Sequence, residues 1–246
     1  MSSDKFTFKQ FEVWHNKCGM KVGTDGVLLG AWIDTRECRS MLDIGTGTGL
    51  IALIAAQRNP NLSVTAIDIM PDAVAQAREN VIRSPFADRI EVLEGDFLDM
   101  ESAGGQDGHP TPLFDAIVSN PPFYVADIHS QSTERDMARH ASSLPLNMLV
   151  QHAAGILSPT GRLSLILPFT AASDAIGLAY MNGLQLCRRT DVWGNERCVP
   201  KRSLLEFRSA YLECKSIKDQ LIIRDASNAY TDAYRRLTED LYVRLG

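Results

Sequence analysis

The segment Ser119-Asn120-Pro121-Pro122-Phe123-Tyr124 contains the residues best suited to chemistry in this chain. Its two prolines stiffen the backbone and remove two N–H donors. The Asn120 side-chain oxygen and the Pro121 carbonyl remain as acceptors that can bind both N–H bonds of a planar amino or amide group. This leaves the nitrogen lone pair free to attack a methyl group without a strong base. Phe123 or Tyr124 can stack on the acceptor plane, so we assign the catalytic role to residues 120–124.

A glycine-rich loop, Asp43-Ile44-Gly45-Thr46-Gly47-Thr48-Gly49, is the second candidate site. Glycines allow a sharp turn and let a ligand lie directly on the backbone. The Gly-x-Gly-x-Gly spacing differs from the Gly-x-Gly-x-x-Gly fingerprint of dehydrogenases, which seats a pyrophosphate on a helix N-terminus. The carboxylate of Asp43 attracts the ammonium and sulfonium groups of S-adenosylmethionine but would repel a pyrophosphate. The loop therefore predicts S-adenosylmethionine as the cofactor.

Two more carboxylates follow predicted strands farther along the chain. Asp68, with Ile69 after it, can accept hydrogen bonds from both ribose hydroxyls. Asp96, with Phe97 after it, can meet the adenine amino group. Each aspartate alone would also fit a helix cap or a turn. Their order after Asp43, each at a strand end, predicts one cofactor site.

These motifs need a scaffold that brings strand ends together. Apolar runs predict buried strands, and helical patterns lie between them. This alternation predicts a parallel sheet covered by helices on both faces, with functional residues at the carboxyl ends of the strands. The predicted strands cover 41–44, 63–67, 90–93, 114–119 and 162–167, and the helices cover 50–57, a segment from Pro71, and about 144–157. Residues 184–192 and 204–214 predict an antiparallel pair at the sheet edge.

Composition limits the class of protein. The chain has 246 residues, 45% of them hydrophobic, and carries no apolar run long enough to span a bilayer. Its N-terminus lacks the apolar core of a signal peptide. The five cysteines are scattered and form no Cys-x-x-Cys pair, which argues against a disulfide framework or a zinc site. We therefore expect a cytoplasmic protein without metal or membrane partner. A monomer is expected, although the sequence leaves the oligomeric state open.

Positive charge is concentrated in one segment, although the net charge is −5. Residues 186–218 contain eight basic and four acidic side chains, and the first 24 residues are also basic. Ordinary solvated surface is one interpretation of these patches, and RNA binding is the other. The candidate RNA-binding residues are Lys9, Arg188, Arg189, Arg197, Lys201 and Arg202. Residues 101–112 predict a surface insertion, and residues 126–141 could form a substrate lid.

Taken together, the motifs resemble those of the class I amino-methyltransferases. The stretches Phe6–Phe11 and Met20–Trp32 are similar to the bacterial tRNA(1)(Val) adenine N6-methyltransferase family, and the resemblance continues to about residue 207. It implies a Rossmann-like α/β fold with a seven-stranded, mostly parallel sheet and an antiparallel edge strand. It also implies a domain over 41–246 and an N-terminal extension, 1–40, over the cofactor site. Lys21, Thr24 and Asp25 would then touch the cofactor.

The resemblance implies N6-methylation of adenine 37 in tRNA(1)(Val), with tRNA as partner. The motif residues alone leave other acceptors open, because an amide and an adenine amino group pose the same hydrogen-bonding problem. A glutamine side chain of a protein, or an amino group of rRNA or DNA, would also fit Asn120. A non-catalytic binding module is disfavoured by the intact glycine loop, and a dehydrogenase is disfavoured by the glycine spacing.

Overall fold

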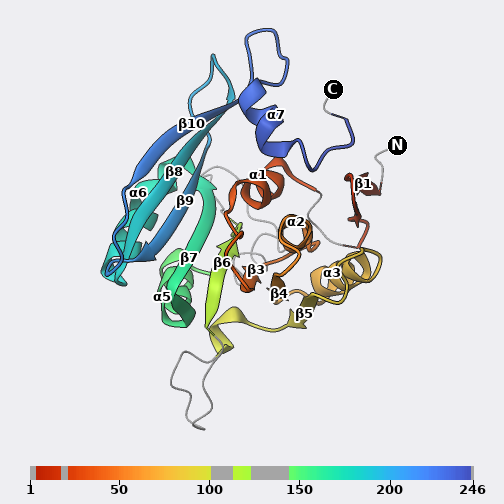
Figure 1. Cartoon of the computed structure of the whole chain (residues 1–246), viewed down its shortest axis with the longest axis horizontal. Helices are drawn as coiled ribbons and strands as arrows, with labels where there is room; N and C mark the ends of the chain where they lie inside the picture. Colours follow the sequence, from red (N-terminus) through yellow and green to blue (C-terminus); the bar gives the residue numbers. More distant parts are fainter. Residues whose placement is uncertain (1–3, 18–21, 101–112, 123–143, 245–246) are drawn as a thin grey trace, which may run out of the picture.

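A twisted, mixed β-sheet forms the centre of the protein, with helices on both faces (Figure 1). The computed structural model describes residues 4–17, 22–100, 113–122 and 144–244. Within these ranges the sheet has eight strands in the order β10-β8-β9-β7-β6-β3-β4-β5. The strands are β3 (Ser40–Ile44), β4 (Ser63–Asp68), β5 (Ile90–Glu94), β6 (Phe114–Ser119), β7 (Leu157–Pro168), β8 (Leu184–Asn195), β9 (Arg202–Ser209) and β10 (Ile217–Arg224).

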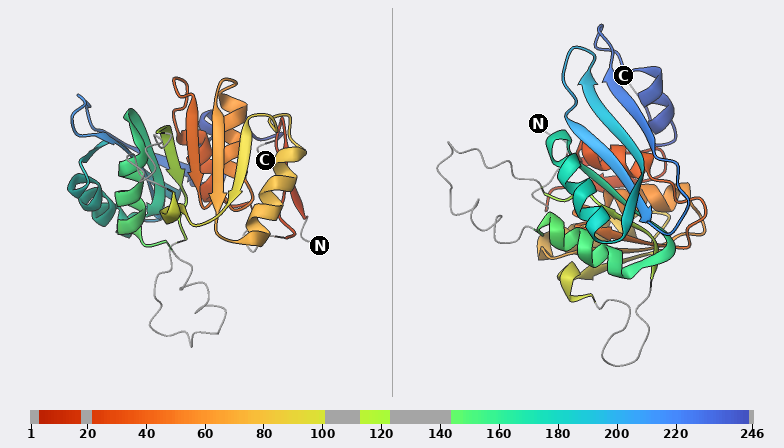
Figure 2. Two further views of the ribbon diagram at one scale, coloured as in Figure 1. Left: turned by 90° about the horizontal axis from the view of Figure 1, so that it is seen from below. Right: turned by 90° about the vertical axis from the view of Figure 1, so that its left-hand side faces the viewer.

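The helices divide between the two faces of the sheet. One apolar core lies between the sheet and α1, α2, α3 and α7, and the other lies under α5 and α6 (Figure 2). The helices are α1 (Thr24–Trp32), α2 (Leu50–Arg58), α3 (Pro71–Ile82), α5 (Leu146–Ile156), α6 (Ala172–Met181) and α7 (Asp232–Thr238), with short 3-10 turns η1 (Phe97–Asp99) and η2 (Phe169–Ala171). Strands with both faces covered are mainly apolar, as β3 and β6 are, and their few buried polar residues include Asp43 and Ser119.

The predicted elements agree with the structure from residue 40 to residue 168. Five of the predicted strands and three helices are present, and Pro71 is the first residue of α3, where its fixed φ suits the helix. Strands β3 to β7 run parallel to one another, as the βαβ alternation requires. The α/β Rossmann-like fold class is therefore confirmed.

The C-terminal part of the sheet differs from the expectation. Strand β9 is antiparallel to both β7 and β8, so the antiparallel strand lies inside the sheet. The edge is β10, which runs parallel to β8 and raises the described sheet from the expected seven strands to eight. The sequence did not indicate β10 because its first four residues are all exposed and show no apolar alternation.

The N-terminal and C-terminal segments pack against each other. A small hairpin of β1 (Lys5–Thr7) and β2 (Glu12–Trp14) lies beside α3. Residue Phe8 forms an isolated antiparallel bridge with Tyr242, and their rings stack 5.9 Å apart. Helix α7 lies against β10 and α1 (Figure 1). This contact joins the two ends of the chain on one side of the molecule.

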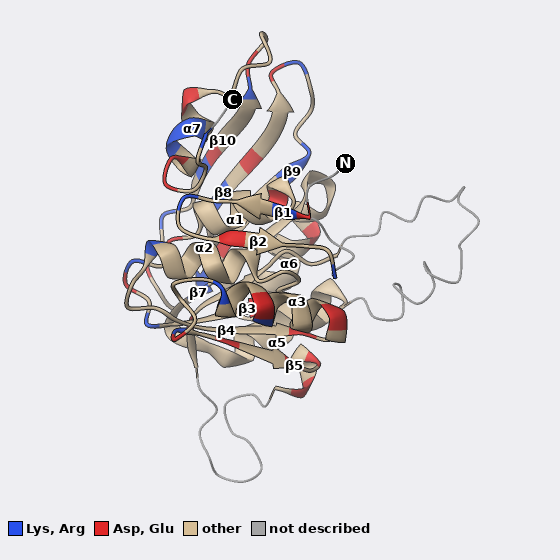
Figure 3. Cartoon of the chain, turned by 90° about the vertical axis from the view of Figure 1, so that its right-hand side faces the viewer, with Lys and Arg blue, Asp and Glu red and all other residues tan. Residues whose placement is uncertain are grey.

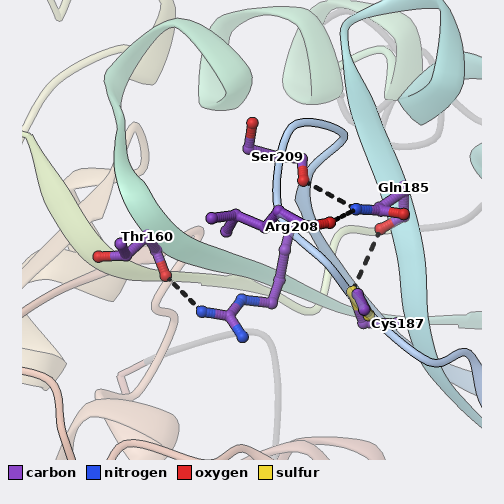
Figure 4. Close-up of a disulfide and its surroundings, with 7 residues drawn as sticks. Thr160, Gln185, Cys187, Arg208 and Ser209 are labelled. Carbon is purple, nitrogen blue, oxygen red and sulfur yellow. Dashed lines mark hydrogen bonds between the residues drawn. A yellow bond between two sulfur atoms is a disulfide. The ribbon is translucent and has the colours of Figure 1, made fainter.

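One disulfide bond contradicts the expectation drawn from the cysteines. Cys187 on β8 is bonded to Cys214, which follows β9, across a Cα–Cα distance of 5.7 Å (Figure 4). The two residues are 27 positions apart in sequence, and the antiparallel return of β9 alongside β8 brings them together. Beside the bond, the Gln185 side chain donates to the carbonyl oxygens of Ser209 and Leu212. The scattered spacing of the cysteines could not reveal this tertiary proximity.

Candidate active site

The register of the parallel strands places the predicted motifs in one row. Ile44 of β3 is the partner of Ser119 on β6 and of Ile67 on β4, and Asp68 is the partner of Glu94 on β5. The residues that follow these strand ends therefore lie side by side at the carboxyl edge. The chain passes from β3 to β4 and β5 on one side and returns to β6 on the other. A ligand site is expected at such a switch point.

The glycine loop has the backbone conformation that its sequence predicts. Gly45, Gly47 and Gly49 all have positive φ, at 68°, 58° and 80°. An L side chain rarely adopts these angles, so glycine is required at each turn. A Cβ atom added at Gly45 would meet nothing within 4 Å, which shows that this part of the loop faces open space. The backbone there is accessible to a ligand.

Asp43 lies beneath the loop and is fully buried, at 0% exposure. Its Oδ2 accepts a hydrogen bond from the Thr46 hydroxyl at 2.7 Å. Burial raises the pKa of Asp43 to about 7, the Thr46 hydrogen bond opposes this shift, and the negative charge of Asp68 adds to it. The carboxylate is therefore placed to hold the loop in shape through Thr46 rather than to reach a ligand at the surface.

Asp68 connects two segments of the predicted cofactor site. Its Oδ2 accepts the backbone N–H of Gly47 at 2.8 Å, and its Oδ1 accepts that of Met70 at 3.0 Å. Each carboxylate oxygen keeps a second lone pair for a ligand hydroxyl. Ile69 follows with 46% of its surface exposed, an unusual position for a large apolar side chain. These two residues offer a polar and an apolar contact next to the glycine loop.

Asp96 and Phe97 follow β5 at the far end of the row. Asp96 caps η1 by accepting the Leu98 backbone N–H at 2.9 Å, and it remains half-buried. Phe97 is buried in the core, with its ring edge-on to His152 at 4.8 Å. Asp96 is thus available at the edge, whereas Phe97 contributes mainly to packing beneath it.

The Asn-Pro-Pro segment leaves β6 directly beside the glycine loop. Ser119 is buried, and its hydroxyl donates to the Ile44 carbonyl at 2.9 Å, which fixes the ends of β6 and β3 against each other. After it Asn120 is half-buried, Pro121 is buried and Pro122 is exposed. No role was predicted for Ser119 from the sequence, although a polar residue at the end of an apolar strand can indicate a contact with a neighbouring strand. The predicted residues Phe123 and Tyr124 lie outside the described residues.

Helix α1 brings the N-terminal segment to the same edge of the sheet. Thr24 is exposed and Asp25 half-buried in its first turn. Asp25 accepts a hydrogen bond from Arg202 at the start of β9, at 2.7 Å. Gly26 and Gly30 let α1 pack closely on α2, because a Cβ at either position would lie about 3.0 Å from Leu50 or Ile54. The predicted cofactor contact Lys21 lies outside the described residues.

The six candidate RNA-binding residues do not form one exposed basic surface. Arg197 and Lys201 are exposed in the loop between β8 and β9. Lys9 is also exposed but donates to the Glu239 carbonyl at 2.5 Å. Along the ribbon in Figure 3, positions of Lys and Arg are interspersed with positions of Asp and Glu.

The three arginines of the set that lie on strands have protein partners. Arg188 lies over the Trp32 ring at 4.0 Å and donates to the Trp32 carbonyl at 3.1 Å, and burial lowers its pKa. Arg189 is held by Asp191 at 2.7 Å. Arg202 is held by Asp25, as described above. These partners follow from the register of the sheet, which the number of basic residues in the sequence cannot predict.

Neither a metal-binding cluster nor a membrane-spanning helix is found in the described parts of the chain. They contain no group of three or more His, Cys, Asp and Glu side chains that could hold a metal ion. No helix among them is long and apolar enough to cross a membrane.

The residues at the carboxyl edge fit S-adenosylmethionine. The open space above Gly45 gives the cofactor room to lie on the loop. Asp68 offers acceptors to ribose hydroxyls, and the exposed Ile69 offers an apolar surface to an adenine ring. The same edge leads directly to Asn120, which follows Ser119 at the end of β6.

Comparison with known proteins identifies the family. Residues 18–176 match the model of the methyltransferase small domain family. A relative from Bacteroides thetaiotaomicron, named tRNA1(Val) (adenine(37)-N6)-methyltransferase, is 41% identical over 246 residues and covers 100% of both chains. A relative of the same name from Porphyromonas gingivalis is 45% identical over 250 residues, covering 98% of this chain and 96% of its own.

Solved structures support the fold at lower identity. A predicted O-methyltransferase from Agrobacterium tumefaciens superposes with a TM-score of 0.67 at 22% identity, covering 88% of this chain and 96% of its own. A ribosomal protein L11 methylase from Lactobacillus delbrueckii gives a TM-score of 0.54 at 17% identity, covering 81% and 84%. The resemblance inferred from the sequence motifs is confirmed: the chain belongs to the methyltransferase small domain family, and within it to the family whose relatives are named tRNA1(Val) (adenine(37)-N6)-methyltransferase.

Proposed function

We propose that this chain is an N-methyltransferase that transfers the methyl group of S-adenosylmethionine to N6 of adenine 37 in tRNA1(Val). The observation that carries the proposal is the register of β3 and β6, which puts the glycine loop and Asn120 side by side at the switch point. Full-length relatives with this activity in their names support the choice of adenine over other planar nitrogens.

The proposed cofactor contacts combine loop, strand ends and the N-terminal extension. Asp43 and Thr46 keep the loop in its open turn, and Asp68 binds the ribose while tying Gly47 to β4. The full proposed set is Lys21, Thr24, Asp25, Asp43, Gly45, Thr46, Gly47, Gly49, Asp68, Ile69, Asp96, Phe97 and Asn120. Within it we assign Asp43 and Phe97 to positioning, because both are buried. We further propose that residues 1–40 form an extension over this site and 41–246 the transferase domain.

The proposed chemistry depends on acceptors at the end of β6. When bound, S-adenosylmethionine supplies an electrophilic methyl group. The Asn120 side-chain oxygen and the Pro121 carbonyl accept the two N–H bonds of the adenine amino group and turn its lone pair out of the ring plane. No strong base is needed, because the nitrogen loses its proton after it has become cationic. Pro122, Phe123 and Tyr124 complete the proposed catalytic segment, with the aromatic rings stacking on the base.

The test of this proposal uses Asn120→Ala. Removing one preorganised acceptor is expected to lower kcat by about 100-fold or more, while the affinity for S-adenosylmethionine stays within a few-fold of the wild type. Methyl transfer is measured with labelled cofactor and tRNA, and cofactor affinity is measured by calorimetry. The matched control is Asn182→Ala, whose side chain donates to the Leu178 carbonyl at 2.8 Å at the end of α6. Near-wild-type turnover in the Asn120 variant contradicts the mechanism.

The acceptor itself is identified by a second experiment. The wild-type protein is incubated with labelled S-adenosylmethionine and either total tRNA or total protein, and the labelled residue is located by mass spectrometry. N6-methyladenine in tRNA is the expected product. Methylated glutamine in a protein would instead assign the same site to the other acceptor that Asn120 can hold.

A further inference from the structure

A cavity separate from the cofactor site lies beside the carboxyl edge, on the side of β7 away from the glycine loop. Its volume is about 480 Å³, and it is lined by Phe169, Asp191, Trp193, Pro200, Lys218, Asp219 and Gln220. Phe169 directly follows β7, and its backbone N–H donates to the Lys201 carbonyl at 3.1 Å. The backbone N–H of Lys201 in turn donates to the Val192 carbonyl at 2.8 Å. These bonds fix Phe169 against the β8–β9 loop.

The inner wall of this cavity is held in place by buried polar contacts. Asp191 is 4% exposed and accepts hydrogen bonds from Arg189 at 2.7 Å and from Ser203 at 2.6 Å. Arg189, so oriented, lies 5.4 Å from the centre of the Phe169 ring. A buried carboxylate with both partners in place forms a rigid support for the guanidinium. The aromatic wall therefore has a cation fixed behind it.

Two half-exposed aromatic rings in one small cavity indicate a flat ligand. Phe169 and Trp193 are both only half-buried, so each ring leaves part of its surface open to the cavity. Lys218 is exposed at the rim and adds a positive charge. Aromatic rings with adjacent cations are the combination by which proteins bind single-stranded nucleic acid, because every base has a π-face and every nucleotide a phosphate.

The position of the cavity relates it to the target nitrogen. Strands β6, β7, β9 and β8 are consecutive neighbours, so β8 lies three strand spacings, or about 14 Å, from β6. This separation is too large for the target adenine to occupy both places. When the target base is at Asn120, another nucleotide of the same RNA loop can reach the cavity.

We propose that the cavity between Phe169 and Trp193 binds a nucleobase near the methylated adenine, by stacking. The proposal rests on the proposed function, because it takes the substrate to be a single-stranded RNA loop. The stacked base would hold the loop open and add affinity without touching the reacting nitrogen. Trp193 and Phe169 are thus substrate-binding residues, and Asp191 is a positioning residue that acts through Arg189.

Binding is tested by Trp193 fluorescence with an RNA hairpin that carries the anticodon arm of tRNA1(Val). Stacking is expected to quench the emission of Trp193 as RNA is added. The Trp193→Phe variant supplies the background from Trp14 and Trp32, and its emission should not respond. The same hairpin in excess salt should release the quench, because phosphate contacts are lost.

Activity is measured on the same hairpin with two substitutions at Trp193. Trp193→Ala is expected to raise KM by roughly 10- to 100-fold with little change in kcat, whereas Trp193→Phe keeps a stacking face and restores most of the affinity. Tyr211→Ala is the control, because Tyr211 is 97% exposed and follows β9 at its opposite end. Thermal unfolding of each variant confirms that it is folded.

The outcomes separate this proposal from the proposed function. Methylation of the hairpin with no quench and an unchanged KM in Trp193→Ala overturns the base-binding cavity alone. Quenching without any methylation of RNA supports the cavity and overturns the proposed acceptor. If the hairpin is not methylated and the emission is not quenched, both proposals are overturned.

Discussion

At the scale of single residues, the aspartates at the strand ends bind backbone groups of the protein and still have acceptor sites for a ligand. Asp68 accepts backbone N–H groups from Gly47 and Met70, and Asp96 caps a 3-10 turn. A turn-forming role and a ligand role were alternatives in the sequence. In the structure they are compatible, since a carboxylate has more acceptor sites than two backbone groups use.

The Asp68 side chain allows the two roles to be separated. Asp68→Ala removes the ribose acceptor and the support of Gly47, and should weaken S-adenosylmethionine binding by about 1.5–3 kcal/mol. Asp68→Asn keeps one oxygen that can accept the Gly47 N–H and should lose less. Calorimetric titration of both variants measures the difference. Equal affinity in the wild type and in Asp68→Ala would remove Asp68 from the cofactor site.

Asp43 predicts a dependence of stability on pH. Its pKa is raised by burial from 3.8 to about 7, so the native state binds a proton that the unfolded state has lost. This contribution is present in full below pH 3.8 and is lost as pH rises to about 7, by at most about 4 kcal/mol. Urea unfolding of wild type and Asp43→Asn at pH 5 and pH 8 tests it. The wild type should lose stability relative to the variant on going to pH 8, and a constant difference would contradict the buried carboxyl.

At the scale of elements, the β8–β9 hairpin contains positive charge that is largely used within the protein. Arg188, Arg189 and Arg202 support α1, Phe169 and Asp25, respectively. Exchanging these arginines for acids would disturb the fold as well as any contact with RNA. Arg197 and Lys201 are the exposed members of the candidate set in this hairpin, and they test its surface charge alone.

Charge reversal in the hairpin loop is expected to weaken RNA binding. The double variant Arg197→Glu, Lys201→Glu should reduce the slope of log affinity against log salt by about 1–2, since each lost phosphate contact contributes nearly one. The slope is measured by fluorescence anisotropy with labelled tRNA. Arg36→Glu is the control, because the Arg36 side chain is 85% exposed and lies between α1 and the amino end of β3, whereas the hairpin loop follows the carboxyl end of β8. A slope equal to that of the control would exclude the hairpin loop from the interface.

At the scale of the whole molecule, the two ends of the chain cover the same face of the sheet. Arg58 at the end of α2 is central to this contact. It donates to Asp240 at 2.7 Å and to the carbonyls of Leu237 and Ala31, so one guanidinium joins α1, α2 and the segment around α7. Loss of the Arg58 contacts should loosen the C-terminal segment before the central sheet unfolds.

Arg58→Ala should lower the free energy of unfolding by about 1–3 kcal/mol, because several part-buried acceptors lose a charged donor together. Hydrogen exchange should show the gain in mobility mainly in α7. Arg83→Ala is the matched control: Arg83 follows α3, pairs with Glu79 one turn earlier and lies over the Trp14 ring, and losing these partly exposed contacts should cost about 0.5–1 kcal/mol. A similar small loss in both variants would show that α7 is held by apolar contacts alone.

Much of the cofactor site could be read from the sequence because its signals are local. Each signal depends on only a few neighbouring residues. Examples are the glycines with positive φ, the proline that begins α3, and an apolar run that ends in a carboxylate. Strand β10 lacked such signals, whereas helix α7 carried a local N-cap signal at Thr231, although this helix was not predicted. The exposed first half of β10 has no apolar pattern, and pairing with β8 alone makes it a strand.

The sequence by itself determined the α/β fold class and the turn of the glycine loop, because backbone conformation depends on neighbouring residues. For the same local reason it predicted the Asn-Pro-Pro segment as the place where the acceptor nitrogen binds. The tertiary structure alone decided which charges are available. Asp43 is buried under its loop, Arg202 is paired with Asp25, and Cys187 meets Cys214 across the sheet. Such partners are set by strand register over long sequence separations. The same register places Asn120 next to the glycine loop, and so turns separate motifs into one candidate active site.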